Sequence, residues 1–339
     1  MPGATPPMEE KSRRVAQAVS RAAERSLGGP VKIENLGPLS GGASADTWSF
    51  DAECRGKRYE LILRLAPPRK DQIRLDRMTE AKLLSLAGEA GVPVPKVLFQ
   101  VDEEGGLGMG YAMERISGET IARRILRDDQ FAEARSRMAR QCGEILCRIH
   151  SMDTSSLPPL KEQPAATLVE QLYPMYKSFG QELPVFEVTF RWLKDHLPES
   201  PQPRFVHGDF RNGNFIVGPE GIRAVLDWEL AHLGDPMEDL GWICVNSWRF
   251  GNIDLPVGGF GRREDLFAGY EAAGRGPVDP GKVHFWEVFG TLKWGLITIL
   301  QAFTHLGGAR RSVELAAIGR RTSETEIDLV RLLRGFAQE

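Results

Sequence analysis

The spacing of hydrophobic residues changes from helical to strand-like early in the chain. Over residues 11–27 they recur on one helical face, at Val15, Ala18, Val19 and Ala22. Beyond residue 30, short apolar runs between turns predict five strands, at residues 31–34, 45–50, 59–65, 96–101 and 110–114. A helical stripe over residues 71–86 interrupts these strands. This part of the chain therefore predicts a small strand-rich lobe with one inserted helix.

After Ser117-Gly118 the pattern becomes mainly helical. Periodicity predicts helices at residues 119–127, 130–151, 166–180, 184–197, 263–273, 279–305 and 310–336. Asp235–Glu238 predicts a further helix start, with Asp at the cap and Pro at the first position. Residues 246–262 have no periodicity and predict a long loop, which is unusual enough to indicate function. We therefore expect a disordered tail over residues 1–10, a small lobe over 11–116 and a helical lobe over 117–339.

The most informative motif is His207–Asn214 (HGDFRNGN), which is followed by Leu226–Glu229 (LDWE). Two apolar runs between these motifs flank Gly218–Gly221 and predict a hairpin. Asn214 and Asp227 sit at its two ends, so their oxygens can meet beside Asp209. Carboxylate and amide oxygens suit Mg²⁺, which substrate phosphates and water complete. A carboxylate beside such an ion can orient a hydroxyl for attack on a phosphoryl group.

Composition narrows the class of protein. The 339 residues carry a net charge of -3, and no basic stripe favours nucleic acid. No run of about 18 apolar residues predicts a membrane span, and the first residues lack the apolar core of a secretory signal. Four scattered cysteines form no CxxC pair, so we expect reduced, buried thiols and no zinc site. A cytoplasmic monomer or homodimer is therefore expected, with no nucleic-acid or membrane partner.

The lobes together with HGDxxxxN and xDWE resemble the aminoglycoside phosphotransferase and choline kinase-like family, over residues 30–335 or so. Leu63–Pro68, Met113–Arg115 and Gly234–Pro236 are most similar to the branch that includes kinase domains attached to acyl-CoA dehydrogenases. The resemblance implies an α+β, protein-kinase-like fold, with a small antiparallel-sheet lobe for nucleotide and a larger, mainly helical catalytic lobe. It also implies transfer of the γ-phosphate of ATP to a hydroxyl of a small molecule, with Mg²⁺ required and GTP as an alternative donor.

By this resemblance, Asp209 is the catalytic base, and Asn214 and Asp227 are the metal ligands. Each residue also has a simpler interpretation, because Asp and Asn are common in turns and loop caps. An acid directly after an apolar run, such as Asp227, is costly to bury without a partner, and a metal would supply one. The three residues together therefore favour the catalytic interpretation.

Four further polar residues around the motif have mainly structural interpretations. The resemblance implies that His207 braces the catalytic loop through hydrogen bonds. Asp235 has a sufficient reason as a helix cap. Asp239, one helical turn later, is expected to brace the catalytic loop. Glu229 is compatible with a position near the metal and with a position at the surface.

A glycine-rich segment between the first two strands is a candidate phosphate loop. Its backbone N–H groups can approach phosphates closely, and a serine can donate a hydrogen bond. The alternative is a simple glycine hairpin turn. The candidate residues are Ser40, Gly41, Gly42 and Ser44.

The third strand carries Arg64, where kinase-like folds usually have a lysine that grips the α- and β-phosphates. A guanidinium also binds phosphate, and Glu80 on the following helix is its expected partner. The alternative for Glu80 is a solvated helix position. Met113, Glu114 and Arg115 correspond by resemblance to the hinge whose backbone bonds the adenine edge, although a strand ending in a charged turn needs no ligand.

The acceptor site is expected in the aromatic segment over residues 242–262. Trp248, Arg249 and Phe250 are candidate acceptor contacts, whereas helical Trp242 is expected in the core. The segment carries two arginines and Asp254 as its single acid, which disfavours a polycationic acceptor and favours a neutral or anionic one. The resemblance adds a hydroxy acid or hydroxyacyl thioester as a candidate.

Three alternatives remain at this point. A nucleotide-binding regulator without transfer activity would not need Asp209, Asn214 and Asp227 together. An aminoglycoside-modifying kinase would usually present a dense acidic surface. A protein kinase would need an activation loop, and the helix start at Asp235 leaves little room for one after Asp227.

Overall fold

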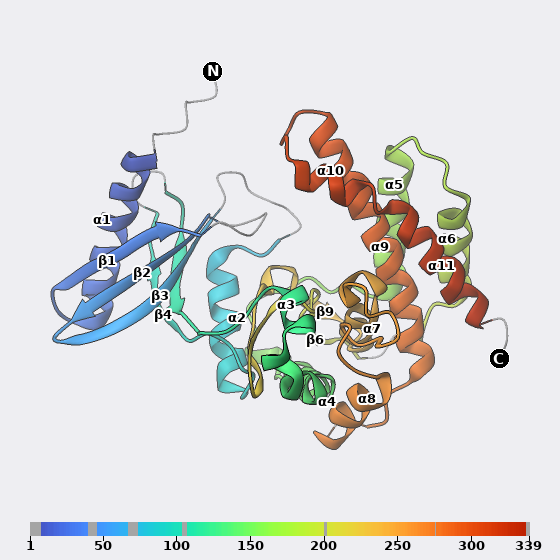
Figure 1. Cartoon of the computed structure of the whole chain (residues 1–339), viewed down its shortest axis with the longest axis horizontal. Helices are drawn as coiled ribbons and strands as arrows, with labels where there is room; N and C mark the ends of the chain where they lie inside the picture. Colours follow the sequence, from blue (N-terminus) through green and yellow to red (C-terminus); the bar gives the residue numbers. More distant parts are fainter. Residues whose placement is uncertain are drawn as a thin grey trace. The chain divides into compact units, whose positions relative to one another are not determined.

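The computed structural model describes residues 8–39, 46–66, 74–103, 107–199, 202–274 and 276–336. The chain forms two compact units, each described by itself (Figure 1). The first unit comprises Met1–Gly118, Ser156–Pro158 and Arg223–Leu230, and the second comprises Glu119–Ser155, Pro159–Ile222 and Ala231–Glu339. Within the described ranges, no helix is long and apolar enough to cross a bilayer. The nucleotide-binding and catalytic roles of the two units stay predictions.

The first unit is built on a five-stranded antiparallel sheet with strand order β1-β2-β3-β5-β4. All five predicted strands are present. They are β1 (Val31–Pro38), β2 (Asp46–Cys54), β3 (Lys57–Leu65), β4 (Val97–Val101) and β5 (Gly110–Glu114). In the central strand β3, Arg64 pairs with Thr47 of β2 and with Tyr111 of β5. The sheet thus fixes the position of the Arg64 backbone on both sides.

Helix α1 (Met8–Leu27) packs against β1 and β4, as the apolar stripe in its sequence requires. Its buried face, which includes Val15 and Val19, joins one hydrophobic cluster with Trp48 and Phe50 of β2. Figure 1 shows α1 lying along the sheet. The buried side chains of the strands and those of the apolar stripe of α1 therefore form a single core.

Helix α2 (Arg77–Glu89) begins six residues later than predicted. The carboxylate of Asp76 accepts hydrogen bonds from the backbone N–H groups of Met78 and Thr79, both at 2.9 Å, and so fixes the helix start. The predicted residues 71–73 lie outside the described part of the chain. The first buried positions of α2 are charged, at Arg77 and Glu80, before the apolar Leu83 and Leu84 follow. This helix therefore carries ionic groups into the interior of the first unit.

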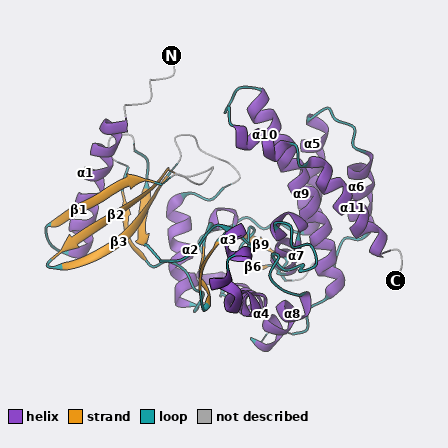
Figure 2. Cartoon of the chain, in the orientation of Figure 1, coloured by secondary structure: helices purple, strands orange, loops and turns teal. Residues whose placement is uncertain are grey.

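The second unit is mainly helical (Figure 2). Its α-helices are α3 (Ala122–Arg127), α4 (Ala132–His150), α5 (Ala165–Ser178), α6 (Pro184–Asp195), α7 (Met237–Cys244), α8 (Arg263–Ala272), α9 (Pro280–Leu306), α10 (Val313–Gly319) and α11 (Thr322–Phe336). The long helix α9 packs against α5, α6, α7, α10 and α11, and α4 packs against α8. The predicted α+β class, with a small antiparallel sheet and a larger helical part, is confirmed.

The prediction of one helix over residues 310–336 was wrong. Two helices, α10 and α11, are separated after Gly319, where a Cβ would lie 2.6 Å from the Cβ of Ala302 on α9. The hydroxyl groups of Thr322 and Thr298 are 2.9 Å apart, which also ties this turn to α9. Packing against a neighbouring helix therefore sets the break, and the local periodicity of the sequence carries no sign of it.

Short elements connect the helices around the motif. The predicted hairpin is present as β7 (Phe215–Gly218) and β8 (Gly221–Val225), while β6 (Arg204–Val206) pairs with β9 (His232–Gly234). The 3₁₀ helices are η1 (Asp129–Phe131), η2 (Thr154–Ser156), η3 (Trp228–Leu230) and η4 (Asn246–Arg249). The predicted loop over residues 246–262 contains η4, turns and one isolated bridge between Val257 and Gly261, so its irregular character is confirmed. All four cysteines are free and buried, as expected.

Candidate active site

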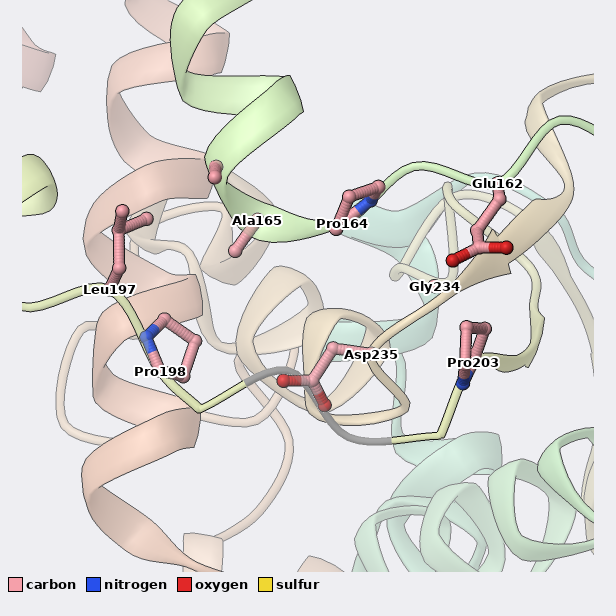
Figure 3. Close-up of a pocket in the computed structure, with 9 residues that line it drawn as sticks. Glu162, Pro164, Ala165, Leu197, Pro198, Pro203, Gly234 and Asp235 are labelled. Carbon is pink, nitrogen blue, oxygen red and sulfur yellow. The ribbon is translucent and has the colours of Figure 1, made fainter.

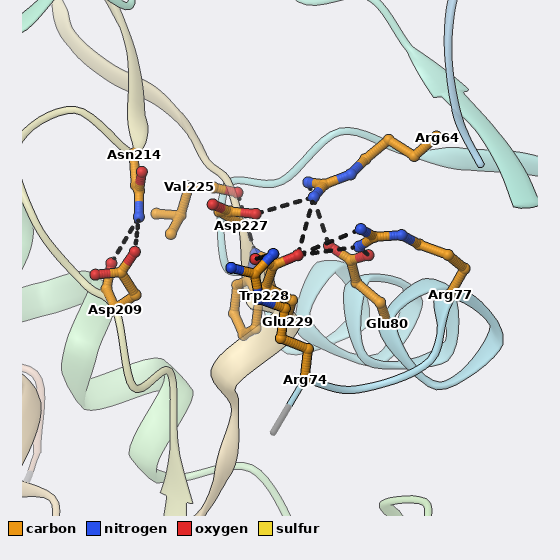
Figure 4. A network of polar contacts seen from close by, with 10 residues as sticks. All are labelled: Arg64, Arg74, Arg77, Glu80, Asp209, Asn214, Val225, Asp227, Trp228 and Glu229. Atoms are coloured by element: carbon orange, nitrogen blue, oxygen red, sulfur yellow. Dashed lines mark hydrogen bonds and ion pairs between the residues drawn. The ribbon is translucent and has the colours of Figure 1, made fainter. Parts of the chain in front are cut away.

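The carboxylate of Asp209 lies in the second unit and accepts three hydrogen bonds. Its Oδ1 accepts from Trp242 Nε1 at 2.8 Å and from Arg211 Nε at 3.0 Å. Its Oδ2 accepts from Asn214 Nδ2 at 2.7 Å (Figure 4). A carboxylate has about four acceptor positions, so these donors leave one position for a further hydrogen. Asp209 is therefore held rigidly while keeping the capacity to accept one substrate hydroxyl.

The orientation of the Asn214 amide follows from its contacts. Its Nδ2 donates to the backbone carbonyl of Asp209 at 2.9 Å as well as to Oδ2. Because only the nitrogen of an amide can donate, the Oδ1 atom must face away from Asp209. Asn214 is buried and directly precedes β7, so the hairpin holds this direction. The amide oxygen is thus presented as an oxygen ligand of the kind that Mg²⁺ takes.

The fully buried Asp239 of α7 holds the loop that carries Asp209. Asp239 accepts hydrogen bonds from the backbone N–H groups of His207 at 2.8 Å and Gly208 at 2.9 Å, and its Oδ2 lies 3.0 Å from Nε2 of His150. Burial acts to raise the pKa of Asp239, but the hydrogen bond and charge of His150 and the N–H of His207 outweigh it, so the pKa is lowered. The predicted bracing contact of Asp239 is present.

His207 has the structural contact expected of it. Its Nδ1 accepts the backbone N–H of Asp209 at 3.2 Å, and its ring is fully buried against Phe210. Asp235 accepts the N–H of Met237 at 2.9 Å, so it caps α7 as predicted, although Pro236 occupies the cap position itself. These two residues therefore support the loop and the helix that surround Asp209.

A separate pocket of about 160 Å³ lies beside Asp235 (Figure 3). Its lining is mostly apolar, with Leu197, Pro198 and Pro203 among the contributors and Glu162 as a second acid. Neither Asp209 nor Asn214 lines it. The pocket is therefore not the predicted catalytic site.

In the first unit, Arg64 of β3 makes the predicted contact with Glu80. Its Nη1 lies 3.2 Å from Glu80 Oε1, and its Nη2 lies 2.9 Å from Asp227 Oδ1 and 3.7 Å from Glu229 Oε2 (Figure 4). A guanidinium can reach three carboxylates at once because its donors form a planar fork. Arg64 thus takes the place of the usual lysine in contact, while its role toward nucleotide phosphates stays a prediction.

Sequence reasoning missed two arginines of the same network. Arg77 lies 2.5 Å from Glu80 and 3.3 Å from Glu229, and Arg74 lies 3.3 Å from Glu229. Glu229 is buried, so the surface interpretation is wrong. Burial and then the charge of Asp227 raise the pKa of Glu229, against the opposing effect of the arginines. Three arginines face three acids, so the network is close to neutral. The attraction between the opposite charges offsets part of the cost of removing them from water.

Asp227 differs from the other acids of this network in its exposure and backbone. Its side chain is 31% exposed, whereas those of Glu80 and Glu229 are at most 7% exposed. Its φ of 68° lies in the left-handed region, which Asp tolerates better than most residues. The partly exposed carboxylate of Asp227 fits a Mg²⁺ ligand. Among the described residues, no three His, Cys, Asp or Glu side chains are grouped so that they could hold a metal ion by themselves.

Only some of the candidate nucleotide-binding residues lie in the described part of the chain. Ser40, Gly41, Gly42 and Ser44 lie outside the described residues. The N–H of Glu114 donates to Lys96 O and that of Arg115 to Glu60 O, both at 2.9 Å. These two amide groups are therefore already occupied, so the predicted backbone contact with adenine would need a different group near Met113.

The candidate acceptor residues have distinct surroundings. Trp248 is buried beside Trp242, with ring centres 5.2 Å apart. Arg249 donates to the carbonyls of Cys244 and Ile253 and lies 2.9 Å from the buried Glu287. Its charge is thereby compensated, which disfavours the predicted contact with an acceptor. Phe250 has a φ of 49° and closes the turn after η4.

Trp242 was expected to be a core residue, and it is buried, but its indole N–H also binds Asp209. The missed signal is its spacing, since Trp242 follows Asp239 by three residues on α7 and so shares its helical face. Arg211 was overlooked as well. Its guanidinium carbon lies 4.5 Å from the centre of the Trp248 ring while its Nε binds Asp209.

Solved structures share this fold. A protein of Ralstonia eutropha assigned to the aminoglycoside phosphotransferases has a TM-score of 0.74 and 20% identity, with 94% of this chain and 98% of that chain covered. A choline/ethanolamine kinase family protein of Mesorhizobium loti has a TM-score of 0.59 and 20% identity, with 94% of each chain covered. At this level of identity, the likeness establishes the fold alone.

Relatives in sequence include acyl-CoA dehydrogenase family member 10 of Mus musculus, 33% identical over 179 residues, which is 49% of this chain and 16% of that protein. Family member 11 of Homo sapiens is 28% identical over 197 residues, 53% of this chain and 24% of that protein. The matched regions thus span less than a quarter of those longer relatives. The phosphotransferase enzyme family (APH) matches residues 35–276 of this chain, which therefore belongs to that family.

Proposed function

We propose that the chain is an ATP- and Mg²⁺-dependent phosphotransferase that moves the γ-phosphate to a hydroxyl of a small molecule. The observation that carries the proposal is the Asp209–Asn214 arrangement, in which one amide fixes the carboxylate and turns its own oxygen outward. A regulator that only bound nucleotide would not need a carboxylate held with one acceptor position open. Family membership supports phosphoryl transfer to small molecules in general.

The proposed reaction balances without a further reactant. The hydroxyl oxygen of the acceptor forms a bond to the γ-phosphorus, the bond from that phosphorus to the β–γ bridging oxygen breaks, and its electron pair leaves with ADP. The hydroxyl proton passes to the open position of the Asp209 carboxylate. Because the transition state is loose, Asp209 mainly orients the hydroxyl. Trp242 and Arg211 keep the carboxylate in one orientation during this step.

The nucleotide would be held by the groups of the first unit. Arg64 offers a fixed guanidinium to the phosphates, and Glu80 and Glu229 hold it in place. Asn214 and Asp227 would hold Mg²⁺, which when bound neutralises charge on the phosphates. Ser40 to Ser44 would cover the phosphates. Spectinomycin phosphotransferase with ADP and spectinomycin has the same fold at a TM-score of 0.61, which is consistent with a nucleotide as donor.

Calorimetry of ATP, GTP and ADP binding, with and without Mg²⁺, tests the proposal. Wild type should bind ATP in a Mg²⁺-dependent manner, and Asp227→Asn should lose that dependence. Asp254→Asn is a matched control, because Asp254 is an exposed acid of the loop over residues 246–262. Mg²⁺-dependent binding by the wild type, followed by no turnover on any hydroxyl compound, would favour the regulator. Absence of nucleotide binding would contradict the proposal altogether.

A further inference from the structure

A group of cations and indole donors extends from Asp209 in the second unit. We call it the donor cluster, and it consists of Arg211, Trp242, Trp248, Lys293 and Trp294. The Trp248 ring lies 5.2 Å from Trp242 and 4.7 Å from Trp294, as measured between ring centres. Lys293 Nζ lies 4.9 Å from the centre of the Trp242 ring. The donor cluster is thus continuous from the candidate catalytic carboxylate to helix α9.

Several donors of this cluster lack an acceptor. The Nε1 atoms of Trp248 and Trp294 are buried and have no hydrogen-bond partner among the described residues. A buried donor without a partner costs about 1–3 kcal/mol, so such groups usually have one. Lys293 is half-buried, and it forms no ion pair with any residue that the structure describes. The cluster therefore has more donors and positive charge than its own residues can satisfy.

The donor cluster differs in this respect from the cationic side chains next to it. The neighbouring arginines Arg249 and Arg263 both bind the carboxylate of Glu287, at 2.9 Å and 2.5 Å. Within the described part of the chain, Asp209 is the one carboxylate that accepts a hydrogen bond from the donor cluster, and Trp242, Arg211 and Asn214 already occupy three of its positions. An added anion would compensate Lys293 and accept from the indoles, whereas an added polycation would meet two like charges.

We infer that the donor cluster binds an anionic group of the acceptor, a carboxylate or a phosphate that lies a few bonds from the reacting hydroxyl. The substrate class is then small anionic alcohols, such as hydroxy acids and sugar or polyol phosphates. The inference rests on the proposed function, because it requires Asp209 to act on a hydroxyl of the same molecule. Lys293 is its specificity-determining residue, and aromatic faces hold both cations of the cluster.

Matched pairs of acceptors test the inference on the full chain with MgATP. The pairs are glycerate and glycerol, glycerol 3-phosphate and glycerol, and 3-hydroxybutyrate and 3-hydroxybutyramide, with kanamycin as a polycation. ADP release gives kcat/KM, and tryptophan fluorescence gives binding without turnover. The kcat/KM for each anionic acceptor should exceed that for its neutral partner by about tenfold or more, because one charge-assisted contact contributes that much. The carboxylate and phosphate pairs separate the two kinds of anion.

Lys293→Met should lower kcat/KM for the acids about ten- to a hundredfold and leave the KM for ATP and the use of neutral alcohols unchanged. Lys194→Met is the matched control, because Lys194 Nζ also lies 4.9 Å from an aromatic ring centre, that of Tyr173, on another helix. Equal use of acids and neutral partners, preference for kanamycin, no response to any acid, or acid preference that survives in Lys293→Met each overturns the inference. Loss of MgATP binding in the wild type instead overturns the proposed function, and the inference with it.

Discussion

The indole Nε1 of Trp242 donates a hydrogen bond to Asp209 Oδ1 at 2.8 Å, although the two residues are 33 positions apart in the sequence. The same α7 helix carries Asp239, which binds the backbone of the Asp209 loop. One face of one short helix therefore fixes both the backbone and the carboxylate of the candidate base. Hydrogen bonds to charged groups contribute about 1.5–3 kcal/mol each, so this relationship should be measurable.

Trp242→Phe should lower kcat about tenfold while leaving the affinity for ATP unchanged. The substitution keeps an aromatic ring but removes the donor, so Asp209 Oδ1 retains only Arg211 and its carboxylate becomes less fixed. Steady-state kinetics, once an acceptor is known, gives kcat and KM separately. Trp192→Phe on α6 is the control, since Trp192 stacks on His196 and should leave kcat unchanged. A normal kcat in Trp242→Phe would mean that the indole serves packing alone.

Asp209→Asn should abolish most turnover, by about 10²–10⁴-fold, because a positioned base contributes that much to proton transfer. The amide is nearly isosteric, so the loop held by Asp239 should stay folded. Calorimetry should show ATP binding close to that of the wild type. Loss of nucleotide affinity with preserved turnover would contradict the assigned role. Equal loss in both measurements would indicate a folding defect, which circular dichroism would reveal.

Arg64→Met should destabilise the first unit by about 3–5 kcal/mol, the typical cost of removing one partner from a buried ionic group. Without Arg64, the buried acids Glu80 and Glu229 face fewer arginines and Asp227 loses its 2.9 Å contact. The stability of Arg64→Lys should lie between that of Arg64→Met and that of the wild type, because an ammonium lacks the planar fork of donors with which a guanidinium contacts three carboxylates. Urea unfolding measures the difference.

Arg58→Met is the matched control for Arg64, since Arg58 lies on the same strand and pairs with Asp51, but its side chain is 59% exposed. Exposed ion pairs contribute little to stability, so this variant should unfold close to the wild type. Similar losses for Arg58→Met and Arg64→Met would mean that charge on β3, and not the buried network, sets the stability.

Much of the first unit could be predicted because its signals are local. Short apolar runs between turns mark all five strands of the first unit, and in the second unit HGDFRNGN marks the candidate catalytic loop and the start of the hairpin. The pairing of Arg64 with Glu80 was also predictable from the resemblance. The contacts of Arg74 and Arg77 with Glu229 were not, because Glu229 lies more than 150 residues further along the chain. The contact of Arg77 with Glu80 is local, at a spacing of three residues, and was overlooked. A contact between distant residues leaves no periodicity to detect.

In the second unit, too, contacts between distant residues made predictions from the local sequence pattern fail. The single helix predicted over residues 310–336 follows the local pattern, but contacts of Gly319 and Thr322 with α9 break it. Arg249 was expected at the acceptor because it lies in the long aromatic segment after the motif, yet Glu287 of α9 holds it. In each case tertiary packing against α9 overrides the local signal.

Asp239→Asn should lower the free energy of unfolding at neutral pH. It should also make that free energy fall less steeply as the pH is lowered into the acid range. The pKa of Asp239 is lowered in the folded state, so its contribution is present above the unfolded value of about 3.9 and is lost as pH falls through the folded value. At pH 7 the variant should lose about 1–3 kcal/mol, because an Asn cannot accept all the hydrogen bonds from His207, Gly208 and His150. Urea unfolding at pH 7, 5 and 3 measures both effects.

The difference in free energy of unfolding between the wild type and Asp239→Asn should be similar at pH 7 and 5. It should narrow at pH 3, which lies below the unfolded-state pKa of about 3.9, because the Asp239 carboxylate of the unfolded wild type is then protonated. Asp254→Asn removes an exposed acid and should follow the wild-type curve throughout. A gap that stayed constant down to pH 3 would mean that the Asp239 carboxylate contributes shape and not charge. A narrowing gap would instead show that the ionised form of Asp239, paired with His150 and the His207–Gly208 backbone, is what holds the loop beneath Asp209.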